Sequence, residues 1–240
     1  MRLVGLLGRP GAETPLFGRL LSARLRAELV SIPVAAAAEV RHATHLGKQL
    51  LEHTQASASA MGAPLPSRLV APLVLPKLQR ALQADAPMVL SGFPRTPDQL
   101  AMLQHAGVME PPMIVHLTLE RGEAERRLAA RMVCGNCGEA MVPMPPREGV
   151  PSNLMVHMLE EATDCDAPAP TRAAIDEAEA VKRRLDAYDE QTLPLFDKLR
   201  ARGAVIHEVA VLDSAEDTWD AVAVACGLEP LTQLPLTTKS

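Results

Sequence analysis

Short apolar runs alternate with longer amphipathic stretches along most of the chain. Each apolar run has the length of a strand that is buried on both faces. These runs lie at residues 3–7, 27–32, 88–91, 113–118 and 204–209. Helical patterns cover 16–26, 45–60, 67–83, a stretch from Pro97, 120–131, 176–202 and 214–226. The alternation predicts an α/β fold in which a five-stranded parallel sheet carries helices on both faces.

The bulk composition narrows the classes of function. The 240 residues are 48% hydrophobic, enough for one substantial core with a small inserted subdomain. A net charge of −5 gives no overall basic footprint for nucleic acid. No apolar run approaches the ~20 residues that a membrane span needs. The first residues match neither a secretory signal nor a transit peptide, and the four cysteines predict an intracellular, reducing compartment, cytoplasm and organelle matrix both being open.

The stretch Met88–Thr96 places an arginine where ligands bind in α/β proteins. Its apolar run stops at Gly92-Phe93-Pro94 and is followed by Arg95. Thr96 is suited to cap a helix that begins at Pro97. Because ligands bind at the carboxyl ends of parallel strands, Arg95 can grip a phosphate or carboxylate there. The alternative is an ordinary strand–turn–helix with a solvated arginine.

The turn after the first strand has the context of a phosphate-binding loop but lacks its chemistry. A strand at 3–7, the turn Gly8–Pro15 and a helix follow one another, as such loops require. Pro15 removes a backbone donor, and Glu13 puts a carboxylate where phosphate oxygens would lie. Thr14 and Pro15 suit a helix N-cap and first helical residue. The pattern therefore favours a helix start whose positive end is satisfied by Glu13.

Three motifs resemble adenylate kinases, and the resemblance covers nearly the whole chain. Gly92-Phe93-Pro94-Arg95-Thr96 with Gln99 resembles the monophosphate-binding segment of that family. Residues 127–138, with Arg127, Arg131, Cys134 and Cys137, resemble the entry to its mobile lid. Residues 179–195 resemble the helix after the lid, with Arg184 as the arginine that contacts the transferred phosphate.

The resemblance implies a three-layer P-loop kinase fold and a set of site residues. The core would span 1–230, with a monophosphate-binding arm at 31–75, an inserted lid at 132–171 and a tail at 231–240. ATP and AMP with Mg²⁺ are the implied ligands. The implied catalytic residues are Arg95, Arg127, Arg131 and Arg184. The implied nucleotide-binding residues are Gly8, Gly11, Ala12, Thr14, Gly92 and Gln99.

Several positions depart from the family pattern. In the family loop Gly-x-Pro-Gly-x-Gly-Lys-Gly-Thr, this chain replaces the last four residues. The replacements are Glu13, Thr14, Pro15 and Leu16. Ile32 and Ala37 stand where a threonine and an arginine hold AMP, and Ser91 replaces an aspartate. Arg172 is one residue out of register with an arginine of the family.

The cysteines and one histidine each have two interpretations. The lid resemblance implies a zinc site of Cys134, Cys137 and Cys165, with His157 or an aspartate as the fourth ligand. The alternative is a pair of reduced, partly buried thiols. His116, inside the predicted strand 113–118, is interpreted as a core histidine with its hydrogen bonds satisfied rather than as a catalytic base.

The selective loss of phosphate-binding residues predicts an adenylate-kinase-like protein with impaired phosphoryl transfer. It would serve as a structural or interaction subunit, within a larger protein assembly, and retain weak binding of adenine nucleotide. One alternative is a working nucleoside monophosphate kinase in which Arg9 supplies the charge of the missing lysine. A further alternative is a module that senses nucleotides by lid closure without transfer.

Overall fold

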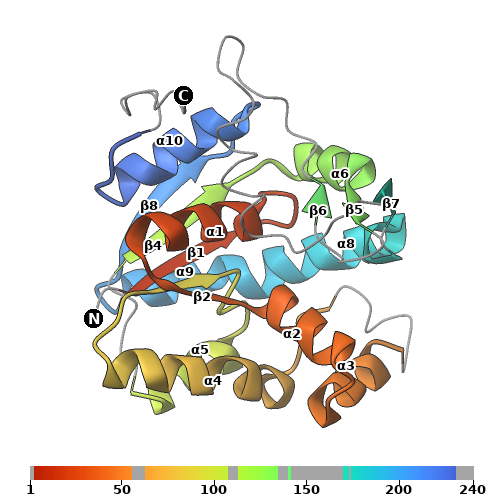
Figure 1. The fold of residues 1–240 in the computed structure, drawn as a ribbon. Coiled ribbons are helices and arrows are strands. Elements are labelled where there is room, and N and C mark those ends of the chain that lie inside the picture. Colours follow the sequence, from red (N-terminus) through yellow and green to blue (C-terminus); the bar gives the residue numbers. More distant parts are fainter. Residues whose placement is uncertain are drawn as a thin grey trace, which may run out of the picture.

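The five main strands form one all-parallel sheet. The computed structural model describes residues 3–55, 63–107, 113–134, 140–141, 170–172 and 174–230. The strand order is β2–β3–β1–β4–β8, and every neighbouring pair is parallel (Figure 1). The strands are β1 (Leu3–Gly8), β2 (Glu28–Ser31), β3 (Met88–Ser91), β4 (Met113–Thr118) and β8 (Val205–Ala210). The α/β fold expected from the sequence is confirmed.

Helices cover both faces of this sheet because alternate strand residues are apolar on both sides. On one face Val4 and Leu6 of β1 share a core with α1 (Thr14–Leu25) and α10 (Ala215–Ala225). On the other face β1 presents Leu3 and Leu7. That face is covered by α4 (Ser67–Gln83), α5 (Pro97–His105) and α9 (Leu193–Arg200).

A small second sheet lies between α6 (Arg121–Ala130) and α8 (Ala178–Ala187). It is antiparallel, in the order β6–β5–β7. Its strands are β5 (Met132–Cys134), β6 (Ala140–Met141) and β7 (Pro170–Thr171). Figure 1 shows this sheet and the helix pair α2–α3 on the side of the main sheet where the strands end. Two separate groups of elements therefore border the carboxyl ends of the strands.

The pair α2 (Ile32–Arg41) and α3 (His45–Gln55) includes a helix that the sequence pattern did not predict. The expected strand at 27–32 ends at Ser31, and α2 begins at once with Ile32. Four consecutive alanines favour the helix, and Ile32 is buried against the α4 side of the core. The two helices pack so closely that a Cβ atom added to Gly47 would lie 2.1 Å from the carbonyl oxygen of Glu39. Only glycine therefore fits at this position.

The helix expected over 176–202 is divided by a π-helical segment. A 3₁₀ turn, η1 (Ala174–Asp176), precedes α8, and η2 (Tyr188–Thr192) separates α8 from α9. Such segments shift the faces of a helix by one residue and are frequent at functional sites. By contrast, α4 runs without a break through Pro72 and Pro76, with the bounds predicted. None of the described helices is long and apolar enough to cross a membrane.

Candidate functional site

The loop after β1 leads into α1 through a strained residue. Gly11 has φ +92°, and Glu13 adopts the left-handed conformation with φ +53°. The helix begins at Thr14, so Glu13 is the N-cap and Pro15 the second helical residue. The prediction that Thr14 caps the helix and Pro15 opens it was wrong by one position. The left-handed turn at Glu13 lets its carbonyl already accept from the Phe17 N–H, at 3.2 Å.

The side chain of Glu13 is buried but does not cap the helix. It is 6% exposed and makes no capping hydrogen bond. Burial raises its pKa, whereas the charges of Arg131, Arg127 and Arg184 act to lower it. No capping hydrogen bond links the Glu13 carboxylate to the helix, so its expected electrostatic contact with the helix end stays a prediction. The charged side chains that act on it are Arg131, Arg127, Arg184 and Asp176.

Asp176 holds two of those arginines together. Its carboxylate accepts from Nε and Nη2 of Arg131, each at 2.9 Å, and from Nη1 of Arg184, also at 2.9 Å. The Asp176 side chain is fully buried. Burial, and then the neighbouring Arg131, lower the pKa of Arg184 to about 10, while Asp176 opposes that shift. Sequence reasoning missed this role of Asp176 and placed the residue only at the start of the helix expected over 176–202.

Arg127 of α6, the third arginine that acts on Glu13, has part of its donor capacity unused. Its Nε donates to Glu123 at 2.6 Å, and its Nη2 donates to the carbonyl of Leu212 at 3.0 Å. Its Nη1 is buried without a hydrogen-bond partner. Arg172 donates to the backbone carbonyls of Ala129 and Asp176 instead of pointing to a free site.

Arg95 is fixed at the end of β3 by its own turn. The Phe93–Pro94 peptide is cis, and Gly92 has φ +68°. The Arg95 Nε donates to the Gly92 carbonyl at 2.8 Å. Thr96 caps α5 by accepting from the Gln99 N–H at 3.2 Å, and α5 begins at Pro97, so the predicted helix start is confirmed. Burial lowers the pKa of Arg95, and no acidic side chain of the described residues pairs with it.

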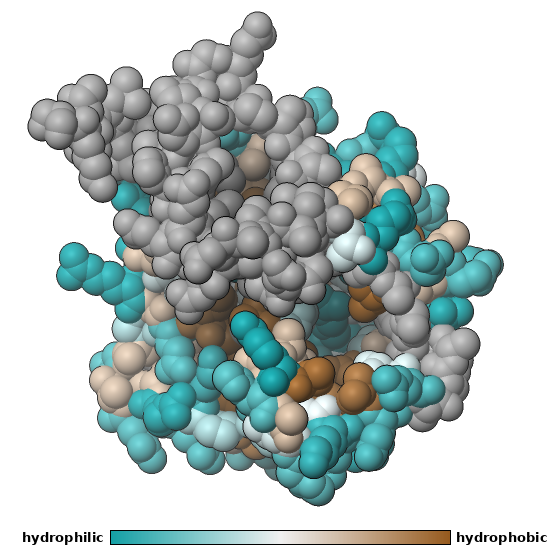
Figure 2. All heavy atoms as spheres, turned by 45° about the vertical axis from the view of Figure 1, so that its right-hand side comes forward, coloured by the Kyte–Doolittle hydropathy of each residue, from teal (hydrophilic) through white to brown (hydrophobic). Residues whose placement is uncertain are grey.

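Together, Arg95, Arg127, Arg131 and Arg184 form what is called the arginine cluster below. Electrostatic effects connect Arg95 with Arg184, and Arg127, Arg131 and Arg184 with Glu13. Figure 2 brings the strand ends forward and shows hydrophobic residues near the middle of this face beside a recess, with polar residues around the margin. The four predicted arginines are therefore close enough for their charges to act on one another or on Glu13.

The other predicted nucleotide-binding residues have structural partners. Gln99 is 2% exposed and uses both ends of its amide within the protein. Gly8 packs against Leu117, and Ala12 and Thr14 are buried in the first turn. Ser91, which stands in place of an aspartate, donates from Oγ to the Thr14 carbonyl at 2.8 Å. Only a hydroxyl, and not an ionised carboxylate, can donate this bond.

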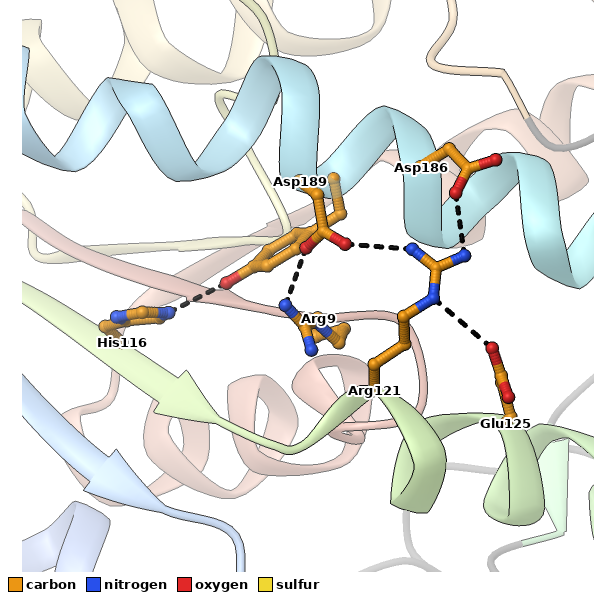
Figure 3. A network of polar contacts seen from close by, with 7 residues as sticks. Arg9, His116, Arg121, Glu125, Asp186 and Asp189 are labelled. Carbon is orange, nitrogen blue, oxygen red and sulfur yellow. Dashed lines mark hydrogen bonds and ion pairs between the residues drawn. The ribbon is translucent and has the colours of Figure 1, made fainter.

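Arg9 belongs to a network of polar contacts around Asp189. Its Nη2 donates to Asp189 Oδ1 at 2.6 Å, and its guanidinium lies 5.3 Å from the ring centroid of Tyr188. The other oxygen of Asp189 accepts from Nη1 of Arg121 at 2.9 Å. Arg121 also binds Asp186 at 2.7 Å (Figure 3). The charge of Arg9 is therefore committed to the junction of α6, α8 and η2.

His116 lies at the other end of this network with one nitrogen satisfied. Its Nε2 lies 2.7 Å from the Tyr188 hydroxyl, and its ring stacks on Phe196 at 3.9 Å (Figure 3). Its Nδ1 is buried without a partner. Burial lowers the pKa of His116 to about 4, so the ring is neutral at pH 7. The core role predicted for it fits these contacts, but its hydrogen bonding is only half satisfied.

The two positions where the family holds AMP carry no phosphate-binding side chain, as expected, and the predicted metal ligands form no site among the described residues. Ile32 packs into the core, and Ala37 is exposed. Cys137, Cys165 and His157 lie outside the described residues, and only the strand position of Cys134 is given, at the end of β5. Within the described ranges, no group of three His, Cys, Asp or Glu side chains could hold a metal.

The comparisons with known proteins point to one family. An adenylate kinase of Desulforamulus reducens is 30% identical over 205 residues, which cover 82% of this chain and 87% of that relative. The chain belongs to the adenylate kinase family. An adenylate kinase of Caldicellulosiruptor bescii is 28% identical over 95% of this chain and 100% of the relative. One of Geotalea uraniireducens is 26% identical over 88% and 92%. No protein-family model matches the chain.

Membership of the adenylate kinase family confirms the resemblance drawn from the three sequence motifs. The role of each site residue and the domain boundaries stay predictions.

Proposed function

We propose that this member of the adenylate kinase family has an impaired phosphoryl-transfer site and retains weak binding of adenine nucleotide through the arginine cluster. The observation that carries the proposal is the buried carboxylate of Glu13, whose charged neighbours are Arg131, Arg127 and Arg184. A triphosphate in the first turn would have to displace this buried acidic side chain, and the loop offers no unpaired positive charge to replace it. Phosphoryl transfer depends on electrostatic stabilisation, so a misplaced carboxylate is costly.

The rest of the loop supports the same proposal. Thr14 stands where the family has the lysine that reaches the β- and γ-phosphates, and it is buried. Pro15 has no N–H to offer a phosphate oxygen. The charge of Arg9, the alternative source for the missing lysine, is paired with Asp189 at 2.6 Å. No other side chain of the loop carries a positive charge.

Residual binding would depend chiefly on Arg95. Its planar fork suits a phosphate, and no described carboxylate competes for it. Arg131 and Arg184 already share Asp176, and Arg127 is bound to Glu123. The four arginines share two acidic partners, Asp176 and Glu123, so only part of the positive charge of the cluster is left for a ligand. We therefore expect the cluster to bind one phosphate group better than a chain of three.

Mg²⁺ does not fit the residues present. In phosphate-binding loops a Ser or Thr hydroxyl contacts the ion, but Leu16 occupies that position and is buried. The Ser91 hydroxyl is bound to the Thr14 carbonyl, and the Asp176 carboxylate is bound to two arginines. No step of the proposed function depends on the ion.

The proposal includes the expected domain roles. Residues 31–75 would form the arm and 132–171 the lid of an adenylate-kinase-like core at 1–230. The protein would act as a structural or interaction subunit of a larger assembly. Purification from the native source under mild conditions tests that role, since a subunit should co-purify in fixed proportion with its partners. Isolation only as free chain would contradict it.

A coupled assay for ADP formation from ATP and AMP with Mg²⁺ tests the impaired site. We expect turnover far below the ~1 s⁻¹ that marks the low end of ordinary kinases. The triple variant Glu13→Gly, Thr14→Lys, Pro15→Gly should bind nucleotide more tightly than the wild type. Thr14→Lys alone is the matched control, because its lysine would face the retained Glu13.

The outcomes separate the alternatives. Wild-type turnover above about 1 s⁻¹ would establish a working kinase and end the proposal. Strong thermal stabilisation by a nucleotide without turnover would favour the sensor, whereas weak stabilisation without turnover is expected for the impaired subunit. A triple variant that binds nucleotide no better than the wild type would refute the role given to Glu13.

A further inference from the structure

The last strand of the main sheet, β8, has an outer edge that no described strand covers. β8 stands at the end of the strand order, and β4 is its neighbour among the described strands (Figure 1). It has six residues, whereas β2 at the opposite edge has four. Soluble proteins usually keep edge strands short or interrupt them with proline, because a long free edge recruits other strands. β8 has neither protection.

Alternate residues of β8 direct their backbone groups away from the sheet. The N–H of Val211, directly after the strand, donates to the Thr118 carbonyl of β4 at 2.9 Å. Because successive residues of a strand direct their N–H and C=O groups to opposite sides, the odd-numbered residues of β8 also face β4. The residues whose backbone groups face outward are Ile206, Glu208 and Ala210. An added strand would find donors and acceptors here.

Beside this edge, an apolar groove of about 750 Å³ is lined by residues of β8 and α10. The apolar residues of its lining include Leu212, Ala221, Val224 and Ala225. Val224 is 62% exposed. Val205, which is 53% exposed, lies on the same face of β8 as Val209, which packs toward α10. A strand added at the edge would therefore place every second side chain over this apolar surface.

The charge around the groove is mainly negative. The segment 205–230, which forms the whole lining, contains no lysine or arginine. Its six acidic residues are Glu208, Asp213, Glu216, Asp217, Asp220 and Glu229. Three arginines reach the segment from other elements: Arg200 pairs with Glu208, and Arg127 and Arg24 donate to the carbonyls of Leu212 and Glu229. The remaining excess of negative charge favours a partner with positive charge.

A second copy of this chain suits the groove less well than a different protein does. Most dimers of identical chains are symmetric, so the same surface lies on both sides of the contact. The acidic segment 205–230 would then face itself. Like charges across an interface oppose association.

The tail of the chain, residues 231–240, is not suited to form a parallel strand at this edge. Helix α10 covers the same face of the sheet as α1. The chain moves from β1 through α1 toward the β2 edge, whereas a strand after α10 would move past β8, in the opposite direction. Its crossover would therefore have the opposite hand. About 98% of such crossovers share one hand, so this arrangement is disfavoured.

We propose that the outer edge of β8 and the groove beside it bind an extended segment of another protein. The segment carries apolar side chains at every second position and a net positive charge. It pairs with the outward backbone groups of β8 and adds a strand to the main sheet. This inference rests on the interaction role in the proposed function and names the surface that performs it.

The experiment titrates the full chain with a short peptide of alternating valine and threonine that carries a lysine at each end. We expect binding, and weaker binding when both lysines are replaced by glutamate. Methylation of the peptide nitrogens that face β8 should weaken binding about tenfold or more. In NMR hydrogen exchange, the peptide should slow the amides of Ile206, Glu208 and Ala210. The amides of His207 and Val209 should be unaffected, because they already face β4.

Two pairs of variants test the edge and the groove separately. Glu208→Pro removes an outward N–H, which proline can lack at an edge, and should weaken the peptide about tenfold. Glu208→Thr is its matched control, since it loses the same charge but keeps the N–H. Val224→Lys should also weaken binding. Val40→Lys is the control for it, because Val40 is an exposed valine of α2. If Glu208→Pro does not fold, the Val224→Lys and Val40→Lys pair decides.

Several outcomes would overturn the inference. One is a wild-type chain that does not bind the peptide, or a Val224→Lys variant that binds it equally well. A chain ending at Pro230 that binds the peptide far more tightly than the full chain would make the tail the occupant. A wild-type dimer that Glu208→Pro dissociates would make a second copy the occupant.

Purification from the native source separates this inference from the proposed function. A partner that co-purifies equally with wild type and Glu208→Pro would keep the subunit role and refute this surface alone. Isolation of the wild type as free chain would refute the subunit role, and the partner strand with it.

Discussion

Arg131 and Asp176 form a two-contact ion pair in which each hydrogen bond measures 2.9 Å and the carboxylate is fully buried. The same carboxylate binds Arg184 at 2.9 Å. One acidic group thus keeps two arginines of the cluster close together despite their repulsion. This contact joins the end of α6 to η1, the turn that precedes α8.

Asp176→Asn should destabilise the protein strongly. It would leave two buried guanidinium groups with no neutralising charge, and breaking a buried ion pair costs about 3–5 kcal/mol. Urea denaturation at pH 7 measures the loss. Asp197→Asn is the control, since Asp197 pairs with Arg200 but is 85% exposed. That exposed pair should contribute about 0–1 kcal/mol. Equal effects of the two substitutions would contradict the role given to Asp176.

Glu13→Gln should change the pH dependence of stability above pH 4.5. Burial raises the pKa of Glu13 above its ordinary 4.5. Between pH 4.5 and this raised pKa, the Glu13 carboxyl group is protonated in the folded chain and ionised in the unfolded chain. The stability of the wild type therefore falls as pH rises through this window. Glu13→Gln lacks this term and should gain stability relative to the wild type as pH rises.

Urea midpoints at several pH values from 4 to 8 check the Glu13 prediction. Glu52→Gln, at an exposed position of α3, is the matched substitution and should leave the wild-type profile unchanged. Parallel profiles for Glu13→Gln and the wild type would rule out a buried carboxylate with a raised pKa.

His116→Phe should remove a second pH dependence, of opposite sign. Burial lowers the pKa of His116 from 6.5 to about 4. Between these two pH values the imidazole is protonated in the unfolded chain and neutral in the folded chain. Wild-type stability should rise with pH across the window, by about 3 kcal/mol in all. In His116→Phe this rise should disappear, and overall stability should drop because the Tyr188 contact is lost.

The titration of the imidazole by NMR gives a direct check on His116. We expect its ring to stay neutral down to about pH 4. His42→Gln, at an exposed position, serves as the control for the unfolding profiles and should keep the wild-type slope. A His116 ring that titrates near pH 6.5 would contradict the prediction.

Ser91→Asp restores the residue type of the family and should nevertheless destabilise this chain. Ser91 is 1% exposed, and its hydroxyl donates to the Thr14 carbonyl. A carboxylate would face that carbonyl without a proton to donate, and it would press against Gly18, whose Cβ position lies 2.8 Å from the serine side chain. Ser91→Ala should cost about 1 kcal/mol and Ser91→Asp clearly more. Thermal unfolding of both variants measures the order, and a more stable Ser91→Asp would contradict it.

The order of strands and helices was readable from the sequence because it depends on local patterns. Five apolar runs gave the five strands, and Thr96-Pro97 gave the start of α5, with errors of a few residues at most ends. The missed α2 follows β2 directly, and its local signals, Ser31 at the N-cap and Pro33 in the first turn, were overlooked because the apolar run continues into Ile32. The π-helical η2 was also invisible, because one extra residue hardly changes the amphipathic pattern.

The sequence by itself determined the family, the fold class and the four arginines, since fixed spacings on helices and strand ends survive as motifs. Only the tertiary structure decided their counter-charges. Asp176 reaches Arg131 from 45 residues away, Asp189 reaches Arg9 from 180, and Thr192 reaches the Arg95 carbonyl from 97. Charge pairing and hydrogen bonding act through space at about 3 Å, and the packing of distant elements sets which groups come that close.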